Sequence, residues 1–217
     1  MKKRDFESKN RYVISLIIAT VVFLLIFAIS YSISYFELRR VSNLQIGVGY
    51  EIFEDKLNHS FFNEQICNGS SFGKVSQDLS FQGRIMDDLE RRLGKQNENV
   101  LLRKKFYSLI EIEHLEFVNE FNNNCSKSKE KINTILFFYS NNESYIKESE
   151  EAGRILGVVA ERNQNLIIYS FDIDLESDLV NKLEKKYNVT SSSTAVINEK
   201  TSIKLPANIQ EIEKHLQ

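Results

Sequence analysis

The fold class is decided by residues 132–173, "INTILFFYSNNESYIKESEEAGRILGVVAERNQNLIIYSFDI". Two short apolar runs, 132–140 and 165–173, flank a segment in which apolar residues recur at every third or fourth position. Short runs rich in β-branched and aromatic residues are typical of buried strands, and the spacing between them is typical of an amphipathic helix. The stretch therefore predicts a strand-helix-strand unit, whose two strands we expect to be parallel.

The chain after this unit continues the alternation. An amphipathic helix is predicted over 175–188, two short strands over 194–199 and 201–206, and a closing helix from 208. We expect the two short strands to form a hairpin with a tight turn at Glu199 and Lys200. The order βαβαββα predicts an α/β domain with a mixed, four-stranded sheet and helices on both faces. We assign it to residues 130–217.

The region before this domain, residues 38–129, is predicted to be a helical stalk. Its apolar periodicity indicates three helices, of which the last two form an antiparallel hairpin with a loop near residues 95–98. Gly94 is the expected C-terminal cap of the first helix of that hairpin. The polar stretch 122–131 is typical of a linker.

The N-terminal part of the chain predicts a transmembrane helix over residues 12–37. Residues 12–36 contain no charged side chain. A helix of that length exceeds the roughly 30 Å hydrocarbon core of a bilayer, since each residue adds about 1.5 Å. A cleaved signal peptide would have a shorter apolar segment of about 7–15 residues.

Flanking charge predicts the orientation of this helix. The first eleven residues carry five Lys or Arg side chains, and only Arg39 and Arg40 follow the span closely. The positive-inside rule therefore places residues 1–11 in the cytoplasm and everything after the span outside the cell membrane. Acceptor triplets for N-glycosylation agree with an outside location, at Asn58, Asn68, Asn124, Asn142 and Asn188.

The only two cysteines, Cys67 and Cys125, both follow the span. In an oxidising compartment we expect them to form a disulfide, which would stabilise the fold by roughly 4 kcal/mol in the chain-entropy model. The alternative is a pair that cycles between dithiol and disulfide. That role requires a low-pKa thiol, and neither cysteine lies in a Cys-x-x-Cys spacing or at a helix start.

Composition excludes some partners and cofactors. The formal net charge is −2 and there is no Gly-rich phosphate loop, so a nucleic-acid partner is not expected. No catalytic group, metal site or cofactor is predicted. The acidic run Asp172, Asp174, Glu176 and Asp178 lacks the glycine and terminal glutamate of a calcium loop, and we interpret Asp174 as a helix N-cap. His114 is expected on a solvated helix face.

The C-terminal segment "KKYNVTSSSTAVINEK", 185–200, resembles the thioredoxin-like superfamily. It is similar to the stretch that carries the superfamily's cis-proline, and Ser193 stands at the proline position. The segment "FFYSNNESYIKES" resembles the strand and Cys-x-x-Cys helix start, with Glu143 and Ile146 at the two cysteine positions. The whole layout resembles archaeal membrane-anchored proteins of that superfamily.

The resemblance implies a redox-inactive thioredoxin-like domain, because a glutamate and an isoleucine cannot carry thiol exchange. The expected function is a membrane-anchored, extracytoplasmic binding or scaffolding module. The resemblance also implies a partner-binding groove formed by two segments. The first contains Asn141, Asn142, Glu143, Ser144 and Tyr145, and the second contains Ser192, Ser193 and Thr194. The alternatives are an envelope oxidoreductase that uses Cys67 and Cys125, and a structural protein that dimerises through its helical region.

Overall fold

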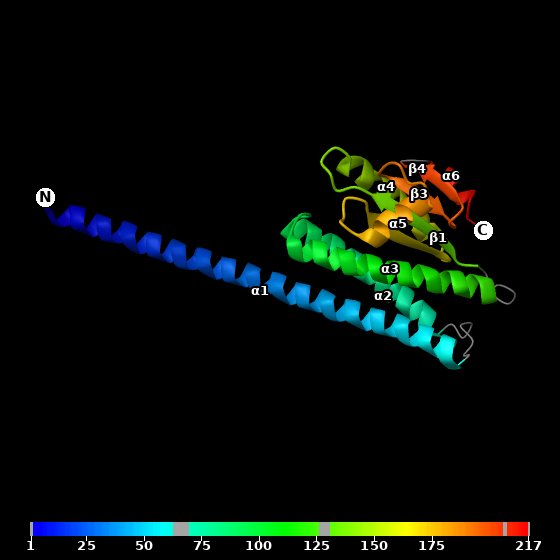
Figure 1. Cartoon of the computed structure of the whole chain (residues 1–217). Coiled ribbons are helices and arrows are strands. Elements are labelled where there is room, and N and C mark those ends of the chain that lie inside the picture. Colours follow the sequence, from blue (N-terminus) through cyan, green and yellow to red (C-terminus); the bar gives the residue numbers. More distant parts are fainter. Residues whose placement is uncertain (1, 63–69, 126–130, 206–207, 217) are drawn as a thin grey trace. The chain divides into compact units, whose positions relative to one another are not determined.

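The computed structural model describes residues 2–62, 70–125, 131–205 and 208–216, and the chain divides into two compact units, Met1–Val41 and Ser42–Gln217. In the second unit, the elements from β1 to α6 follow the predicted order βαβαββα (Figure 1).

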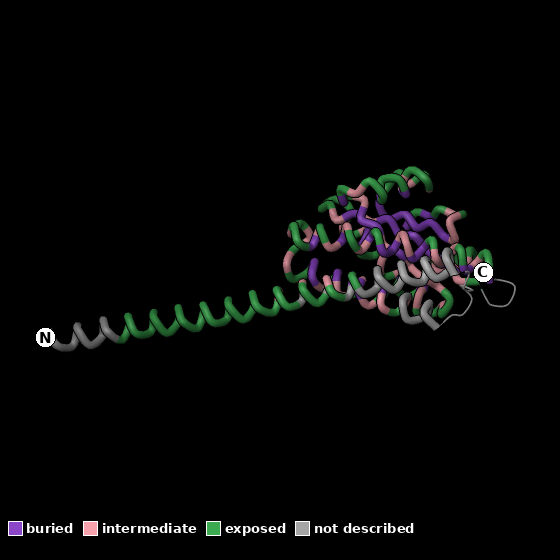
Figure 2. The backbone as a smooth tube through the Cα atoms, turned by 60° about the horizontal axis from the view of Figure 1, so that its bottom comes forward, coloured by how far each residue is buried: buried purple, intermediate pink, exposed green. Residues whose placement is uncertain are grey.

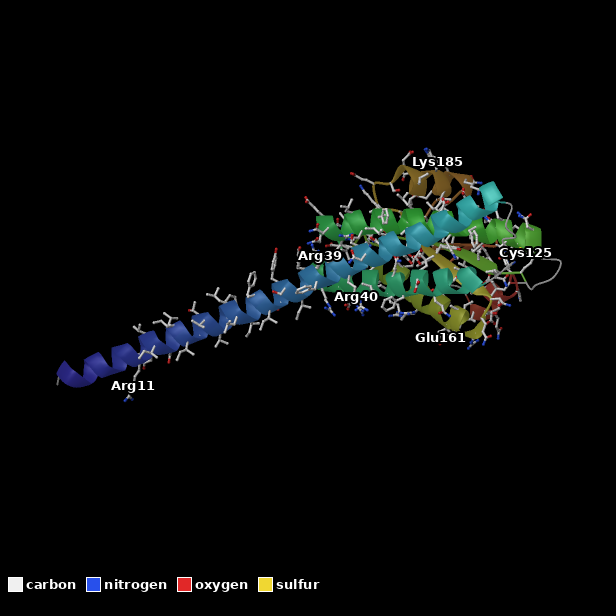
Figure 3. The ribbon with its side chains drawn as sticks, turned by 90° about the horizontal axis from the view of Figure 1, so that it is seen from below. Arg11, Arg39, Arg40, Cys125, Glu161 and Lys185 are labelled. Carbon is white, nitrogen blue, oxygen red and sulfur yellow. The ribbon has the colours of Figure 1, made fainter. Side chains whose placement is uncertain are left out.

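The first unit lies on helix α1, which runs without a break over Lys2–Phe62. The sequence predicts a separate stalk helix after residue 38, but one helix covers both segments because no proline or glycine interrupts residues 2–46. Between Arg11 and Arg40 the helix contains an 18-residue window with a mean hydropathy of 3.0, and by length and composition it could cross a membrane. Its large apolar side chains project outward, with arginines at both ends (Figure 3).

The second unit contains the predicted helical hairpin, formed by α2 (Ser70–Leu93) and α3 (Glu98–Cys125). Gly94 has a φ of +91° and its N–H donates to the Glu90 carbonyl, so the predicted C-terminal cap is confirmed. The hydroxyl of Tyr107 on α3 donates to the carbonyl of Leu79 on α2 at 3.1 Å. Contacts that pair the end of α2 with the start of α3 show that the two helices are antiparallel.

The sheet is mixed and has four strands, as predicted. They are β1 (Asn133–Tyr139), β2 (Leu166–Asp172), β3 (Thr194–Ile197) and β4 (Thr201–Lys204), in the spatial order β2-β1-β3-β4. Strands β1 and β2 are parallel, whereas β3 is antiparallel to both β1 and β4. β2 and β4 are therefore the two edge strands.

Helices cover both faces of the sheet, and the buried residues of the second unit concentrate on its strands (Figure 2). On one face, alternate residues of β1 and β2 such as Phe138 and Phe171 pack against α5 (Asp178–Lys186) and against the α2–α3 hairpin. On the other face, Ile135 and Phe137 of β1 pack against α4 (Ile146–Arg162) and α6 (Ile209–Glu213). The helical hairpin thus shares a hydrophobic core with the sheet.

Two local predictions are corrected by the structure. The N-cap of α5 is Ser177, whose Oγ accepts from the N–H of Val180 at 3.4 Å, rather than Asp174. Asp174 lies three residues too early and binds the loop after β1 instead. The turn between β3 and β4 is centred on Asn198 and Glu199, which both have positive φ, rather than on Glu199 and Lys200.

Candidate functional site

The two segments predicted to form a partner-binding groove lie side by side at one end of the sheet. Residues 141–145 follow β1, and Thr194 begins β3 opposite Phe138 of β1. The hydroxyl of Ser149 on α4 joins the segments, because it accepts from the N–H of Ser140 at 3.1 Å and lies 3.3 Å from Ser193 Oγ. The topology therefore brings together the residues that the sequence groups.

The two segments differ in exposure. Asn142, Glu143, Ser144 and Tyr145 are exposed and Asn141 is half-buried, whereas Ser192, Ser193 and Thr194 are buried. Lys204 of β4 donates to the Ser192 carbonyl at 2.5 Å and pairs with Glu148 of α4 at 3.0 Å. Solvent therefore reaches the first segment but not the side chains of the second.

Ser193 has a φ of +58°, in the left-handed region. A proline ring fixes φ near −65°, so proline cannot adopt this backbone conformation. A serine, unlike a proline, therefore fits the local backbone geometry at position 193.

Two aspartates at the carboxyl end of β2 hold the exposed segment in place. Asp174 Oδ2 accepts from Ser140 Oγ at 2.7 Å and from the backbone N–H groups of Asn141 and Asn142 at 2.8 and 3.0 Å. Asp172 Oδ2 accepts from the side-chain amide of Asn141 at 2.8 Å. The carboxylates of this acidic run are thus used as acceptors, and the described residues contain no cluster suited to a metal ion.

A buried ionic cluster around Lys104 adjoins this loop, and the sequence analysis does not predict it. Lys104 Nζ lies 2.6 Å from a Glu90 carboxylate oxygen and 2.5 Å from Asp172 Oδ2. All three side chains are buried, and Nζ also lies 5.1 Å from the centre of the Tyr139 ring. Burial alone would lower the pKa of Lys104, but Tyr139, Asp172 and Glu90 outweigh it and raise that pKa, so the amine stays charged.

A cavity of about 490 Å³ lies beside this cluster, between the α2–α3 hairpin, α4 and β2. Its apolar wall includes Met86, Phe137, Leu156 and Ile168, and its polar wall includes Glu90, Lys104, Glu111 and Asp172. This size falls within the range of small-molecule pockets. Asn141 also lines the cavity, which links it to the exposed loop.

Glu111 of α3 covers the outer edge of β2. Its Oε1 accepts from the backbone N–H of Ser170 at 2.8 Å, which satisfies a donor that an edge strand leaves unpaired. Glu111 is only 1% exposed, and its other oxygen, Oε2, has no hydrogen-bond partner among the described residues. Burial raises the pKa of Glu111 well above its ordinary value.

His114, expected on a solvated face, is instead fully buried against β2. Its Nδ1 lies 2.8 Å from the Tyr169 hydroxyl and its Nε2 lies 3.2 Å from Ser76 Oγ. Burial lowers the pKa of His114 to about 4, so the ring is neutral at pH 7. The prediction was wrong. The carboxylates beside His114 in the sequence suggested that its helix face is exposed to solvent, but on α3 this position faces the sheet.

Comparisons with models of known protein families, with curated proteins and with solved structures find no match for this chain. The resemblance to the thioredoxin-like superfamily therefore rests on the residues and elements described above, and it stays a prediction.

Cys125 is buried at the end of α3, where Figure 3 labels it. Its predicted partner, Cys67, lies outside the described residues. The Cys67–Cys125 bond therefore stays a prediction. A sulfur that is 1% exposed is poorly placed for exchange with another protein, since thiol–disulfide exchange requires access to the attacked sulfur.

Replacing Gly157 with alanine is expected to stabilise the protein by about 0.5–1 kcal/mol. Glycine lowers helix stability in the interior of α4, and a Cβ at Gly157 would meet nothing within 4 Å. Urea denaturation followed by circular dichroism measures the change. Gly153→Ala is the matched control, because its Cβ would meet Phe137 Cε1 at 3.9 Å, an ordinary contact. A loss of stability in Gly157→Ala would mean that the cavity wall is not open at this position.

Proposed function

We propose that the protein is a single-pass membrane protein whose extracytoplasmic α/β domain is a redox-inactive, thioredoxin-like module that binds a protein partner. The observation that carries this proposal is the loop Asn142–Tyr145. It is exposed to solvent and contains no thiol, Asp174 accepts from the N–H of Asn142 at its start, and Asp174 and Asp172 hold the preceding Asn141. An exposed loop that is held at its start and has no thiol suits recognition better than thiol exchange.

Element order and strand order support the thioredoxin-like assignment. The βαβαββα order, the mixed sheet and the juxtaposition of residues 141–145 with 192–194 agree with what the resemblance implies. Glu143 and Ile146 still occupy the two cysteine positions at the start of α4. Because neither side chain forms a thiolate, these two positions cannot carry thiol exchange, which supports a redox-inactive module.

The composition of α1 supports the membrane anchor. Apolar side chains such as Phe23 and Phe36 are 67% and 68% exposed on the isolated helix, an arrangement that lipid stabilises and water does not. Basic residues cluster before the span, which supports a cytoplasmic N-terminus and a domain outside the cell membrane.

Two surfaces of the domain suit a protein partner. Tyr145 is 50% exposed and stands between polar loop residues and α4, and aromatic side chains of this kind are enriched at protein interfaces. Within the part of the chain that the structure describes, strand β4 pairs with β3 alone, so its other edge can accept an extended segment of a partner. We place the partner at the loop Asn142–Tyr145 because this loop is exposed and is held at its start.

Site-specific photo-cross-linking in cells tests this placement. With p-benzoylphenylalanine at position 145 of the full chain, we expect a light-dependent adduct with one partner of defined mass. The matched control is the same probe at Val158, which is 37% exposed and lies twelve residues, about 18 Å, along α4 from its first residue, Ile146. Equal adducts from both positions, or none from 145, would contradict the placement. An adduct of twice the chain mass would instead favour self-association.

The oxidoreductase alternative has no supporting observation among the described residues. It requires an accessible sulfur, and Cys125 is buried. The dimerisation alternative likewise receives no specific support from the described parts of the helical region, whose α2–α3 hairpin already buries its inner face against the sheet.

A further inference from the structure

Two glycines on the face of α4 that lines the cavity beside β2 leave part of that space unfilled. Gly153 and Gly157 are four residues apart, so they share one face of the helix, and both line the cavity. Packing does not require a glycine at 157, since a Cβ there would touch nothing within 4 Å. The space is bounded by Met86 on α2 and by Ile168 on the sheet.

A buried acceptor in the same wall lacks a donor. Glu111 lines the cavity, is 1% exposed and uses one oxygen to bind the Ser170 N–H. Its Oε2 makes no hydrogen bond of good geometry among the described residues, because the neighbouring Tyr107 hydroxyl donates to the carbonyl of Leu79. A buried polar atom without a partner is costly, so this oxygen is where a ligand donor would gain most.

The charges at this end of the cavity are unbalanced. Three carboxyl groups, those of Glu90, Glu111 and Asp172, face a single ammonium group, that of Lys104. At the mouth of the cavity the charges balance, because two basic residues, Arg84 and Lys95, line it together with two acidic residues, Asp87 and Glu150. Lys95 forms an ion pair with Glu150 at 3.5 Å. The inner wall therefore favours a positive charge and disfavours an anion.

We propose that this cavity binds a small organic cation, a primary amine on an apolar body, whose ammonium group donates to Glu111 Oε2. The apolar body lies in the space opposite Gly157, against Met86 and Ile168. The ammonium group of Lys104 pairs with Glu90 and Asp172, so Glu111 Oε2 remains available to the ammonium group of the ligand. This ligand site is independent of the protein partner proposed for the exposed loop.

Binding of a cation is coupled to a proton. Burial raises the pKa of Glu111 and so favours its protonated form, whereas an adjacent ammonium favours the ionised form. A proton that Glu111 carries is therefore released to the solvent when the amine binds, and the ionised Oε2 accepts from the ammonium. The amine enters already protonated, so up to one proton is released for each ligand bound.

Isothermal titration calorimetry of the full chain in detergent micelles tests the site, with three probes of similar size. These are 2-phenylethylamine, neutral 2-phenylethanol and anionic 3-phenylpropanoate. We expect the amine to bind at least tenfold more tightly than the alcohol, and no binding of the carboxylate. The heat of amine binding should differ between phosphate and Tris buffers because a proton is released.

Two variants locate the site. Glu111→Gln should weaken amine binding at least tenfold and abolish the buffer dependence, while alcohol binding stays within twofold. Gly157→Leu should abolish binding of both probes by filling the space, and Gly157→Ala, which adds one methyl group, should weaken binding of both. Glu150→Gln at the mouth is the matched control and should leave amine binding within twofold.

Several outcomes would overturn the proposal: equal affinity for amine and alcohol, preference for the carboxylate, no binding of any probe, or unchanged amine binding in Glu111→Gln. Thermal unfolding of each variant in the same micelles separates a lost site from a lost fold. If Gly157→Leu does not fold, Glu111→Gln and Gly157→Ala decide the question.

Discussion

Replacing Lys104 with methionine is expected to lower the free energy of unfolding by about 3–5 kcal/mol. The substitution keeps the volume of the side chain but leaves the carboxylates of Glu90 and Asp172 buried without a positive charge. Removal of one partner from a buried ionic cluster is far more destabilising than replacement of the whole cluster. Urea denaturation of the full chain in micelles, followed by circular dichroism, measures the loss.

Two further variants show whether charge is the cause. The triple variant Lys104→Met, Glu90→Gln, Asp172→Asn removes all three charges and should recover at least half of the lost stability. Lys182→Met on α5 is the surface control: its ion pair with Asp178 is exposed, so the change should stay within about 0.5 kcal/mol. A loss below about 1 kcal/mol in Lys104→Met would show that solvent reaches the cluster.

Lowering the pH from about 7 to 4 should cost about 3 kcal/mol of stability through His114. The pKa of His114 is lowered to about 4 in the folded protein, against an ordinary value of 6.5. The unfolded chain therefore binds more protons between these two values, and stability falls as the pH falls through that range. The physical cause is burial: the imidazolium would lose its hydration against Tyr169 and Ser76.

The measurement is the difference in unfolding free energy between the wild type and His114→Gln as a function of pH. Glu111 contributes with the opposite sign, because its raised pKa makes stability fall as the pH rises above about 4.5. This contribution is common to both proteins and cancels in the difference. The advantage of the wild type should shrink steadily from pH 6.5 to pH 4. A flat difference curve for His114→Gln would mean that the ring is solvated.

The strands and the short helices could be predicted from the sequence because their positions follow the pattern of buried apolar residues. Residues such as Phe138 and Phe171 lie in apolar runs on strands covered on both faces, so pattern and structure agree. Gly94 and the β3–β4 hairpin also carry local signals. The one-residue error at that turn arises because Asn198, with side-chain bonds to Thr134 and Asn133, adopts the left-handed conformation.

The polar interior could not be predicted in the same way. Lys104, Ser108, Glu111 and His114 lie on the buried face of α3, in register with Val100 and Val118. Apolar periodicity alone predicts that polar residues such as these face solvent. The sequence does contain one indication of their burial: they follow one another at steps of three or four residues, which continues the apolar face of the helix. Their partners, Asp172 and Ser170, come from a distant strand, so only the tertiary fold reveals the cluster.

The proposed role of the α/β domain outside the cell depends on the membrane anchor. Glycosylation mapping of the full chain, translated in the presence of microsomes, tests it most directly. Asn142 and Asn188 are exposed acceptor sites in the α/β domain, and Ser144→Ala with Thr190→Ala removes both triplets as a control. We expect an uncleaved, carbonate-resistant product that carries glycans, two fewer in the control variant. A product without glycans that protease digests, or a chain that carbonate extracts, would contradict an anchored extracytoplasmic domain.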